Sequence, residues 1–244
     1  MNRATAVSND RAATVAQSAQ SAQSAQSAQS AQVAEVAEMA EVAEVAKVAE
    51  VAEVATVSAP ATVAELMALL ADCHDAWDMP DRSGDPVDIL DHDRQCAELL
   101  RRDFPADEEL QVAGLVHDIG HVLVPGDDAG HGVHGGDAVR GLLGARVARL
   151  VELHVVAKRY LAATDSAHAA ALSASSCRTL VAQGGPMTAA EIAAFESDPE
   201  FTAAIALRRA DDAGKVVGLT VHPLETWRSI VERVAAAADL AVAR

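Results

Sequence analysis

After residue 60, apolar positions along the chain recur every three or four residues, which is the spacing of helices packed on one face. Thr62-Val63-Ala64-Glu65 forms a capping box that predicts a helix as far as Trp77. Proline, glycine and aspartate in residues 79–86 predict a loop, and residues 90–104 predict the next helix. No segment alternates strictly between apolar and polar residues, so the pattern predicts an all-α protein.

The middle of the chain predicts two further helices around a glycine-rich loop. The acidic residues 107–109 predict the first turn of a helix that carries His117 near its C-terminus. Gly120 is the residue predicted to end this helix. Residues 126–136 are rich in glycine and predict a loop. Residues 140–161 predict a long helix whose buried face carries residues spaced by three and four: Val147, Leu150, Val151, His154 and Lys158.

The last third of the chain continues the helical pattern. Residues 184–186 predict a turn, and Thr188 to Glu191 form a second capping box. Pro199 and Pro223 each predict the first turn of a helix, the first running through Asp211 and the second to the C-terminus. We therefore expect one helical body over residues 61–244.

Residues 15–57 are a low-complexity repeat, first of Ser-Ala-Gln and then of Val-Ala-Glu triplets. A three-residue period shifts the valines by about 60° per repeat around a helix, so no fixed apolar face forms. We expect residues 1–60 to be an arm that is disordered or a solvated helix. A role for this arm in binding a partner stays open.

Composition narrows the function classes. The 244 residues carry a formal charge of -17, and the body is acidic, which argues against binding to nucleic acid or anionic membranes. The three cysteines show no CxxC spacing, so they predict neither disulfides nor a thiolate zinc site. Without a signal peptide or a run of about 18 apolar residues, we expect a cytoplasmic protein with no membrane contact. The sequence identifies no protein partner.

Histidines and aspartates at buried or loop positions form the candidate chemistry. His117 and Asp118 are adjacent, so a carboxylate could bridge two ions while the imidazole holds one. The complete candidate set comes from five segments: His92, His117, Asp118, His131, His154, and Asp211 or Asp212. Imidazole and carboxylate ligands suit two first-row transition ions such as iron or manganese. His134 is the rival of His131, and His154 alone would fit a hydrogen-bonded core histidine.

Two cations are expected beside this set. Lys158 lies one helical turn after His154, and Arg208 lies three residues before Asp211, so both should project toward the metals. Two positive side chains favour a phosphate or phosphonate group on the substrate. The alternative is that they pair with the ligand carboxylates.

At these residues the chain resembles the HD-domain superfamily, and within it the mixed-valent diiron oxygenases that cleave organophosphonates, relatives of myo-inositol oxygenase. The motifs that carry the resemblance span about residues 82–215: Gly84–Val87, His92–Gln95, His117–His121, His131 with Gly135, Leu153–Leu161, Gln183–Met187 and Leu207–Asp212. The His-Asp-Ile-Gly motif is shared with many phosphohydrolases, whereas the stretches at 153–161 and 183–187 are more specific. The resemblance implies an HD-domain helical bundle over residues 61–244.

The resemblance also implies a role for each matching residue. One iron of a mixed-valent Fe(II)/Fe(III) pair would be held by His92, His117, Asp118 and Asp211, and the other by Asp118, His131 and His154. His121 would lie near the substrate hydroxyl, and Lys158, Ser176 and Arg208 would hold the phosphonate. The implied reaction uses O2 to cleave the carbon–phosphorus bond of a 1-hydroxyphosphonate, giving a carboxylate and phosphate.

The loop expected to contact the rest of the substrate departs from the family. Arg82 and Asp85 stand where the family has a tyrosine and a glutamate that recognises the substrate amine. Asp85 is shorter by one methylene, and Arg82 would pair with it or repel an ammonium. The resemblance implies 2-amino-1-hydroxyethylphosphonate or an analogue as the substrate, and because of these departures we favour a bulkier or anionic 1-hydroxyphosphonate.

Two other function classes stay open at this point. The same metal ligands with Mn or another divalent ion would suit a phosphohydrolase acting on a phosphate ester. A binding module with a structural metal is the other alternative.

Overall fold

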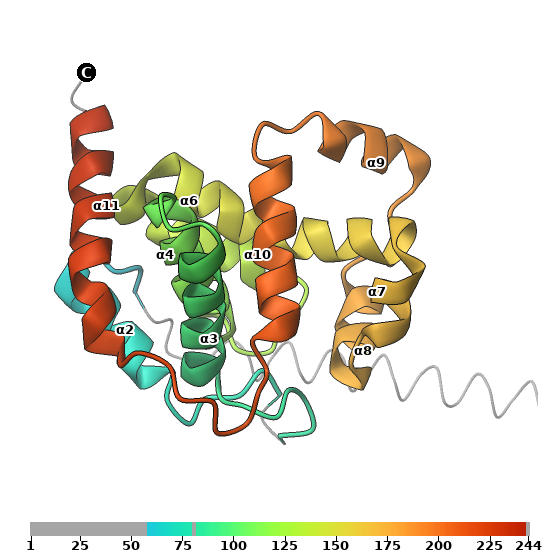
Figure 1. Ribbon diagram of the computed structural model, residues 1–244, viewed down its shortest axis with the longest axis horizontal. Coiled ribbons are helices and arrows are strands. Elements are labelled where there is room, and N and C mark those ends of the chain that lie inside the picture. The colour runs from blue at the N-terminus through green and yellow to red at the C-terminus, as the bar shows by residue number, and fades with distance from the viewer. Residues whose placement is uncertain (1–57, 80–81, 243–244) are drawn as a thin grey trace, which may run out of the picture. The chain divides into compact units, whose positions relative to one another are not determined.

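The computed structural model of the protein describes residues 58–79 and 82–242, and its regular elements are all helical (Figure 1). They are α2 (Val63–Asp72), α3 (Ile89–Asp103), α4 (Glu108–Val116), α5 (Gly120–Leu123), α6 (His131–Thr164), α7 (Ser166–Ala171), α8 (Ala174–Ala182), α9 (Ala189–Glu196), α10 (Phe201–Ala213), the 3-10 helix η1 (Leu224–Trp227) and α11 (Arg228–Val242). The described residues contain no strand, which confirms the all-α prediction. Among them, no helix combines the length and the apolar character that crossing a bilayer requires. The prediction for residues 1–60 lies outside the described residues except at 58–60.

Side-chain caps begin several helices where the sequence predicts them. The Thr62 hydroxyl accepts from the Glu65 backbone N–H at 3.2 Å, and Thr188 and Glu191 form a complete capping box. Helix α2 nevertheless ends at Asp72, short of the predicted Trp77. Asp75, three residues on, has a φ of 60°, and this left-handed conformation is incompatible with continuing the helix.

The glycines near the centre of the chain act differently from the prediction. Gly120 begins the short helix α5 and does not end α4. A Cβ at Gly120 would lie 1.9 Å from the backbone oxygen of His131, so only glycine allows this close approach. The predicted loop over 126–136 is helical from His131 onward, because its glycines are packing positions: a Cβ at Gly136 would lie 2.8 Å from the backbone oxygen of Ala148.

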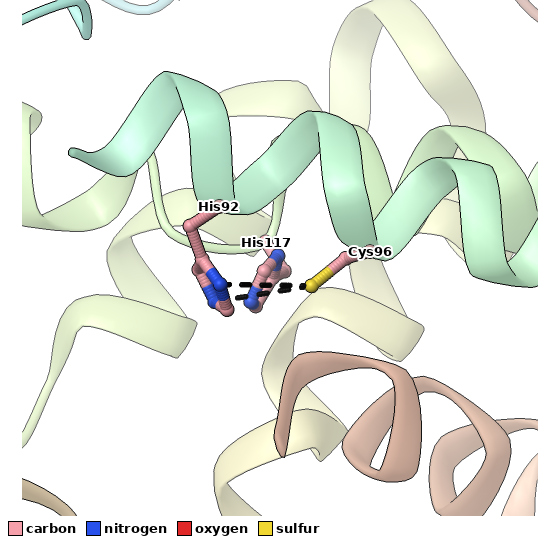
Figure 2. A group of neighbouring side chains, drawn as sticks. All are labelled: His92, Cys96 and His117. Carbon is pink, nitrogen blue, oxygen red and sulfur yellow. Dashed lines mark hydrogen bonds between the residues drawn. The ribbon is translucent and has the colours of Figure 1, made fainter. Parts of the chain in front are cut away.

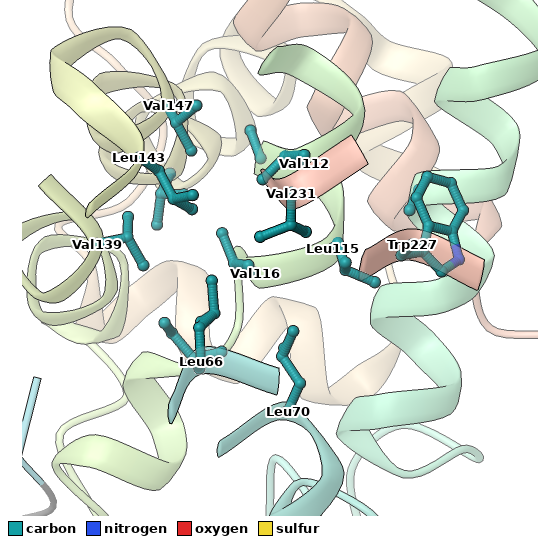
Figure 3. Close-up of a cluster of buried hydrophobic side chains, with 14 of the residues drawn as sticks. Leu66, Leu70, Val112, Leu115, Val116, Val139, Leu143, Val147, Trp227 and Val231 are labelled. Atoms are coloured by element: carbon teal, nitrogen blue, oxygen red, sulfur yellow. The ribbon is translucent and has the colours of Figure 1, made fainter. Parts of the chain in front are cut away.

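Helix α6 connects the parts of the body. It is bent at Gly144, where φ 87° and ψ 173° interrupt the helical path, so the predicted helix over 140–161 is two segments. Helices α4, α5, α10 and α11 pack against it, and α3 packs against α4 and α10 (Figure 1). The main core lies where α2, α4, α6 and α11 meet, as Figure 3 shows, and includes Leu66, Leu70, Leu115, Val116, Leu143, Val147, Trp227 and Val231.

A second, smaller hydrophobic core lies along the later turns of α6. Leu153 and Ala157 of α6 pack there with Phe195 of α9 and Ala204 of α10. Because side chains of α6 pack into both cores, the position of its central turns is fixed by both. His154 and Lys158 come from these turns and are buried.

Candidate metal centre and adjoining pocket

Four buried imidazoles from separate segments are oriented in the same way. In each, Nδ1 lies within hydrogen-bond distance of a backbone carbonyl oxygen and, as the protonated nitrogen, donates to it. The pairs are His92 to Gly214 (2.9 Å), His117 to Gly114 (3.0 Å), His131 to Asp128 (2.7 Å) and His154 to Val151 (2.5 Å). This arrangement sets the tautomer and leaves each Nε2 lone pair available to a metal ion. The Nε2 of His117 is buried and has no hydrogen-bond partner within residues 58–79 and 82–242.

The Asp118 carboxylate lies between these imidazoles. Its Oδ2 is 3.5 Å from His92 Nε2 and 3.6 Å from His117 Nε2. Its Oδ1 is 3.5 Å from His131 Nε2 and 3.6 Å from His154 Nε2. One carboxylate oxygen therefore faces each histidine pair.

Asp211 completes the first of the two groups. Its carboxylate oxygens lie 3.3 Å from His92 Nε2 and 3.6 Å from His117 Nε2. The structure thus brings together all six residues for which the sequence predicts metal binding. Asp212, the alternative to Asp211, points elsewhere and pairs with Arg208 and His168.

The electrostatics of the cluster fit a cation. Burial lowers the pKa of His131 to about 4, with the neighbouring His121 adding to the effect, so this imidazole is neutral. Burial also disfavours a charged His117, but the carboxylates of Asp118 and Asp93 outweigh it and raise the pKa of His117 to about 10. Burial opposes ionisation of Asp118, yet the surrounding imidazoles hold its pKa well below the ordinary value. An anionic carboxylate facing lone pairs attracts a metal ion as it attracts a proton, so this cluster can hold a metal.

Cys96 lies beside this cluster. Figure 2 shows the thiol on α3, one turn after His92 and next to His117. The Cys96 Sγ is 3.8 Å from His92 Nε2. Burial and the Asp211 carboxylate raise the pKa of the thiol well above its ordinary value, and only a thiolate is a strong ligand. The carboxylates are therefore the better ligands here.

Asp93 is a functional candidate that the sequence does not single out. Its side chain is 0% exposed, and its Oδ1 lies 3.1 Å from His117 Nδ1. Burial raises the pKa of Asp93 to about 6, against the lowering effect of His117. A carboxylate on the far side of a metal-binding imidazole orients the ring and increases its basicity.

A small cavity of about 40 Å³ adjoins the cluster and contains the predicted cations in its wall. Lys158 is 5% exposed and Arg208 is 3% exposed. Lys158 Nζ donates to the Thr179 hydroxyl at 2.6 Å, and burial lowers its pKa to about 8. Arg208 pairs with Asp211 and Asp212, which is the alternative contact that the sequence left open. The buried Ser176 lines the same cavity.

The remaining predicted residues divide between the cavity and the surface. His121 lines the cavity and stacks on His131 with ring centroids 4.1 Å apart. Asp85 also lines it, but its partner is Lys215 at 2.6 Å. Arg82 is exposed, and its guanidinium lies 4.8 Å from the centroid of the Trp77 ring.

Lys215 is the second residue that the sequence analysis missed. Its Nζ lies between Asp85 and Asp211, 3.7 Å from an oxygen of the latter. A signal was present, because Lys215 follows Asp211 by four residues, the spacing of side chains on one helix face. The helix ends at Ala213, however, so the spacing alone did not establish the contact.

Comparison with known proteins identifies the family of this chain. The model of the family described as "Myo-inositol oxygenase" matches residues 36–146. The chain is 37% identical over 155 residues to the hydroxymethylphosphonate dioxygenase of Gimesia maris, covering 60% of this chain and 77% of that protein. It is 36% identical over 159 residues to the glycine-betaine-forming [1-hydroxy-2-(trimethylamino)ethyl]phosphonate dioxygenase of Leisingera caerulea, covering 62% and 81%. The chain therefore belongs to the family of phosphonate dioxygenases related to myo-inositol oxygenase, and it is an oxygenase.

Proposed function

We propose that the protein is a diiron oxygenase that cleaves the carbon–phosphorus bond of a 1-hydroxyphosphonate. In this reaction R–CH(OH)–PO3(2-) and O2 give R–COO(-), HPO4(2-) and a proton. The carbon and the C–P bond supply four electrons to O2, so no further reductant is needed. The names of the two relatives, both dioxygenases of hydroxylated phosphonates, support this reaction class.

The observation that carries the proposal is the position of Asp118 between two histidine pairs. His92, His117 and Asp211 would hold one iron, His131 and His154 the other, and Asp118 would bridge them. When bound, the iron pair would supply the redox chemistry with O2 and a Lewis-acid hold on substrate oxygens. Four imidazoles and two carboxylates suit iron better than magnesium or calcium, which prefer oxygen ligands alone.

The residues of the small cavity would bind and orient the substrate. Lys158 and Arg208 supply positive charge for a doubly charged phosphonate, and the Ser176 hydroxyl adds a donor. A phosphonate near Lys158 would favour the ammonium form, reversing the effect of burial on its pKa. We infer that His121 would hold the proton of the substrate hydroxyl on Nε2, because Asp128 Oδ1 lies 3.4 Å from its Nδ1.

The test uses the full chain, purified without oxygen and loaded with iron. We expect O2 uptake and phosphate release in a 1:1 ratio on hydroxymethylphosphonate or a larger 1-hydroxyphosphonate, and a mixed-valent signal in electron paramagnetic resonance. His131→Ala should abolish the coupled reaction. His134→Ala is the matched control, because His134 lies one turn further on and pairs with Asp127 at 2.8 Å, away from the cluster.

A different result would favour the phosphohydrolase alternative. Release of phosphate from a phosphate ester without O2, with Mn or another divalent ion in place of iron, would refute the oxygenase proposal. Equal activity of His131→Ala and the unsubstituted protein would refute the assignment of this cluster as the reaction centre.

A further inference from the structure

A second cavity, which we call the outer chamber, adjoins the small one. It has a volume of about 310 Å³, and Asp85, Ser176 and Lys215 form walls of both cavities. Its other walls include His168 and Ala171 of α7 and Asp212 of α10. The Asp85–Lys215 ion pair therefore lies at the boundary between the two cavities.

Three polar atoms of residues that line the outer chamber are buried and have no hydrogen-bond partner among the described residues. They are Asp85 Oδ1, His168 Nε2 and Asp212 Oδ2. His168 Nδ1 lies 3.3 Å from Asp212 Oδ2, but neither that oxygen nor Nε2 completes a hydrogen bond. A buried polar atom left unpaired destabilises the folded protein. A ligand that satisfies these atoms would recover part of the lost stability.

The charges in the chamber restrict what this ligand can be. The second oxygen of Asp85 pairs with Lys215, and that of Asp212 pairs with Arg208. Each carboxylate is thus already compensated, so a cationic group on the ligand would gain little. A carboxylate on the ligand would face two carboxylate oxygens that can only accept hydrogen bonds.

We propose that the outer chamber binds the substituent on C1 of the substrate, and that this substituent is an uncharged chain of several carbons ending in a hydrogen-bond donor such as a hydroxyl. This inference rests on the proposed function, because the small cavity must hold the phosphonate. Leu172 and Ala171 supply apolar contacts for the carbons, and the unpaired oxygens accept from the terminal donor. Of the bulkier and the anionic substrates considered above, the chamber fits the bulkier one.

Binding in the absence of O2 tests the proposal without turnover. We would measure the Kd of iron-loaded full-length protein by calorimetry for hydroxymethylphosphonate, 1-hydroxybutylphosphonate, 1,4-dihydroxybutylphosphonate and the matching compound with a terminal carboxylate. The dihydroxy compound should bind about tenfold more tightly than hydroxymethylphosphonate, because it adds buried carbon and a hydrogen bond. The carboxylate compound should bind more weakly than the dihydroxy one.

Substitution of the chamber wall provides the control. Ala171→Phe places a ring in the outer chamber and should remove the advantage of the longer compound. Ala170→Phe, on the neighbouring exposed position of the same helix, should leave that advantage intact.

The outcomes separate the two proposals. Equal affinity for short and long compounds, or tighter binding of the carboxylate compound, would overturn the chamber assignment while leaving the phosphonate site standing. An advantage for the long compound that survives in Ala171→Phe would also overturn it. If no phosphonate binds and none is cleaved, the proposed function fails, and the chamber assignment fails with it.

Discussion

Replacing Lys215 with methionine should change which substrates the protein prefers. Lys215 Nζ lies 2.6 Å from Asp85 Oδ2, and the two side chains are only 17% and 14% exposed. In the unsubstituted protein, a substrate ammonium group at this position would meet a neutral ion pair. Lys215→Met leaves the Asp85 carboxylate uncompensated beside both cavities, so the position becomes attractive to a cation.

The size of the effect follows from the distance over which the new attraction acts. Two opposite charges about 4 Å apart interact by about 4 kcal/mol at an effective dielectric constant of about 20. Water reaching the partly exposed pair weakens this attraction, so we expect about 1–3 kcal/mol. That range corresponds to an increase of about 5- to 150-fold in relative preference for the cationic substrate.

The assay compares kcat/KM for 2-amino-1-hydroxyethylphosphonate with kcat/KM for hydroxymethylphosphonate, each followed by phosphate release. The ratio matters, since Lys215 also lies 3.7 Å from Asp211 and its loss would change turnover of both substrates. Lys215→Arg keeps the positive charge and should keep the original ratio. A ratio that stays the same in Lys215→Met, or rises equally in Lys215→Arg, would refute the electrostatic reasoning.

Three further changes test the structure elsewhere. Asp93→Asn should weaken iron binding by about 10- to 100-fold in chelator competition, because His117 loses its orienting carboxylate; unchanged affinity would contradict this. Gly120→Ala should lower the free energy of unfolding by about 1–3 kcal/mol or more, because the added Cβ would lie 1.9 Å from a backbone oxygen of α6. The denaturation midpoint measures this loss, and an unchanged midpoint would show that the backbone relaxes. Arg146 lowers the pKa of Asp107 by direct hydrogen bonding. This pair therefore stabilises the fold at pH values above the unfolded-state pKa of about 3.9, and the stabilisation is lost as the pH falls through the pKa of Asp107 in the folded protein. Asp107→Asn keeps an N-cap for α4 and should flatten the acid limb of the stability curve, which urea unfolding between pH 5 and 2 would detect.

Elements whose signals are local could be predicted from the sequence. The capping residues Thr62 and Thr188 act within one helical turn, so the pattern located both helix starts. The segment over 131–136 could not be predicted in this way. Its glycines resemble a loop, but they permit close contacts with Ala148 and α5, which lie elsewhere in the chain.

The same distinction applies to the site. The residue pattern proposed four histidines, Asp118 and either Asp211 or Asp212 as ligands, and the resemblance selected Asp211. The structure brings these six side chains to one cluster. Asp93 was missed because nothing in its spacing shows that it reaches His117 across a helix pair. A residue that supports a ligand from another segment leaves no periodic signal.

Substrate selectivity depends on pairings that residue type does not reveal. The sequence offers Arg82 as the cation nearest Asp85, yet Arg82 lies over Trp77, and the contact is made by Lys215 from the segment after α10. Either pairing would neutralise Asp85, but they differ in where the ion pair stands. Lys215 also lies 3.7 Å from Asp211. The lysine that neutralises the charge of Asp85 in the substrate pocket is therefore also in contact with the candidate metal cluster. Loss of the positive charge at Lys215 should therefore affect metal affinity and substrate preference together, whereas loss of the charge at Arg82 should affect neither.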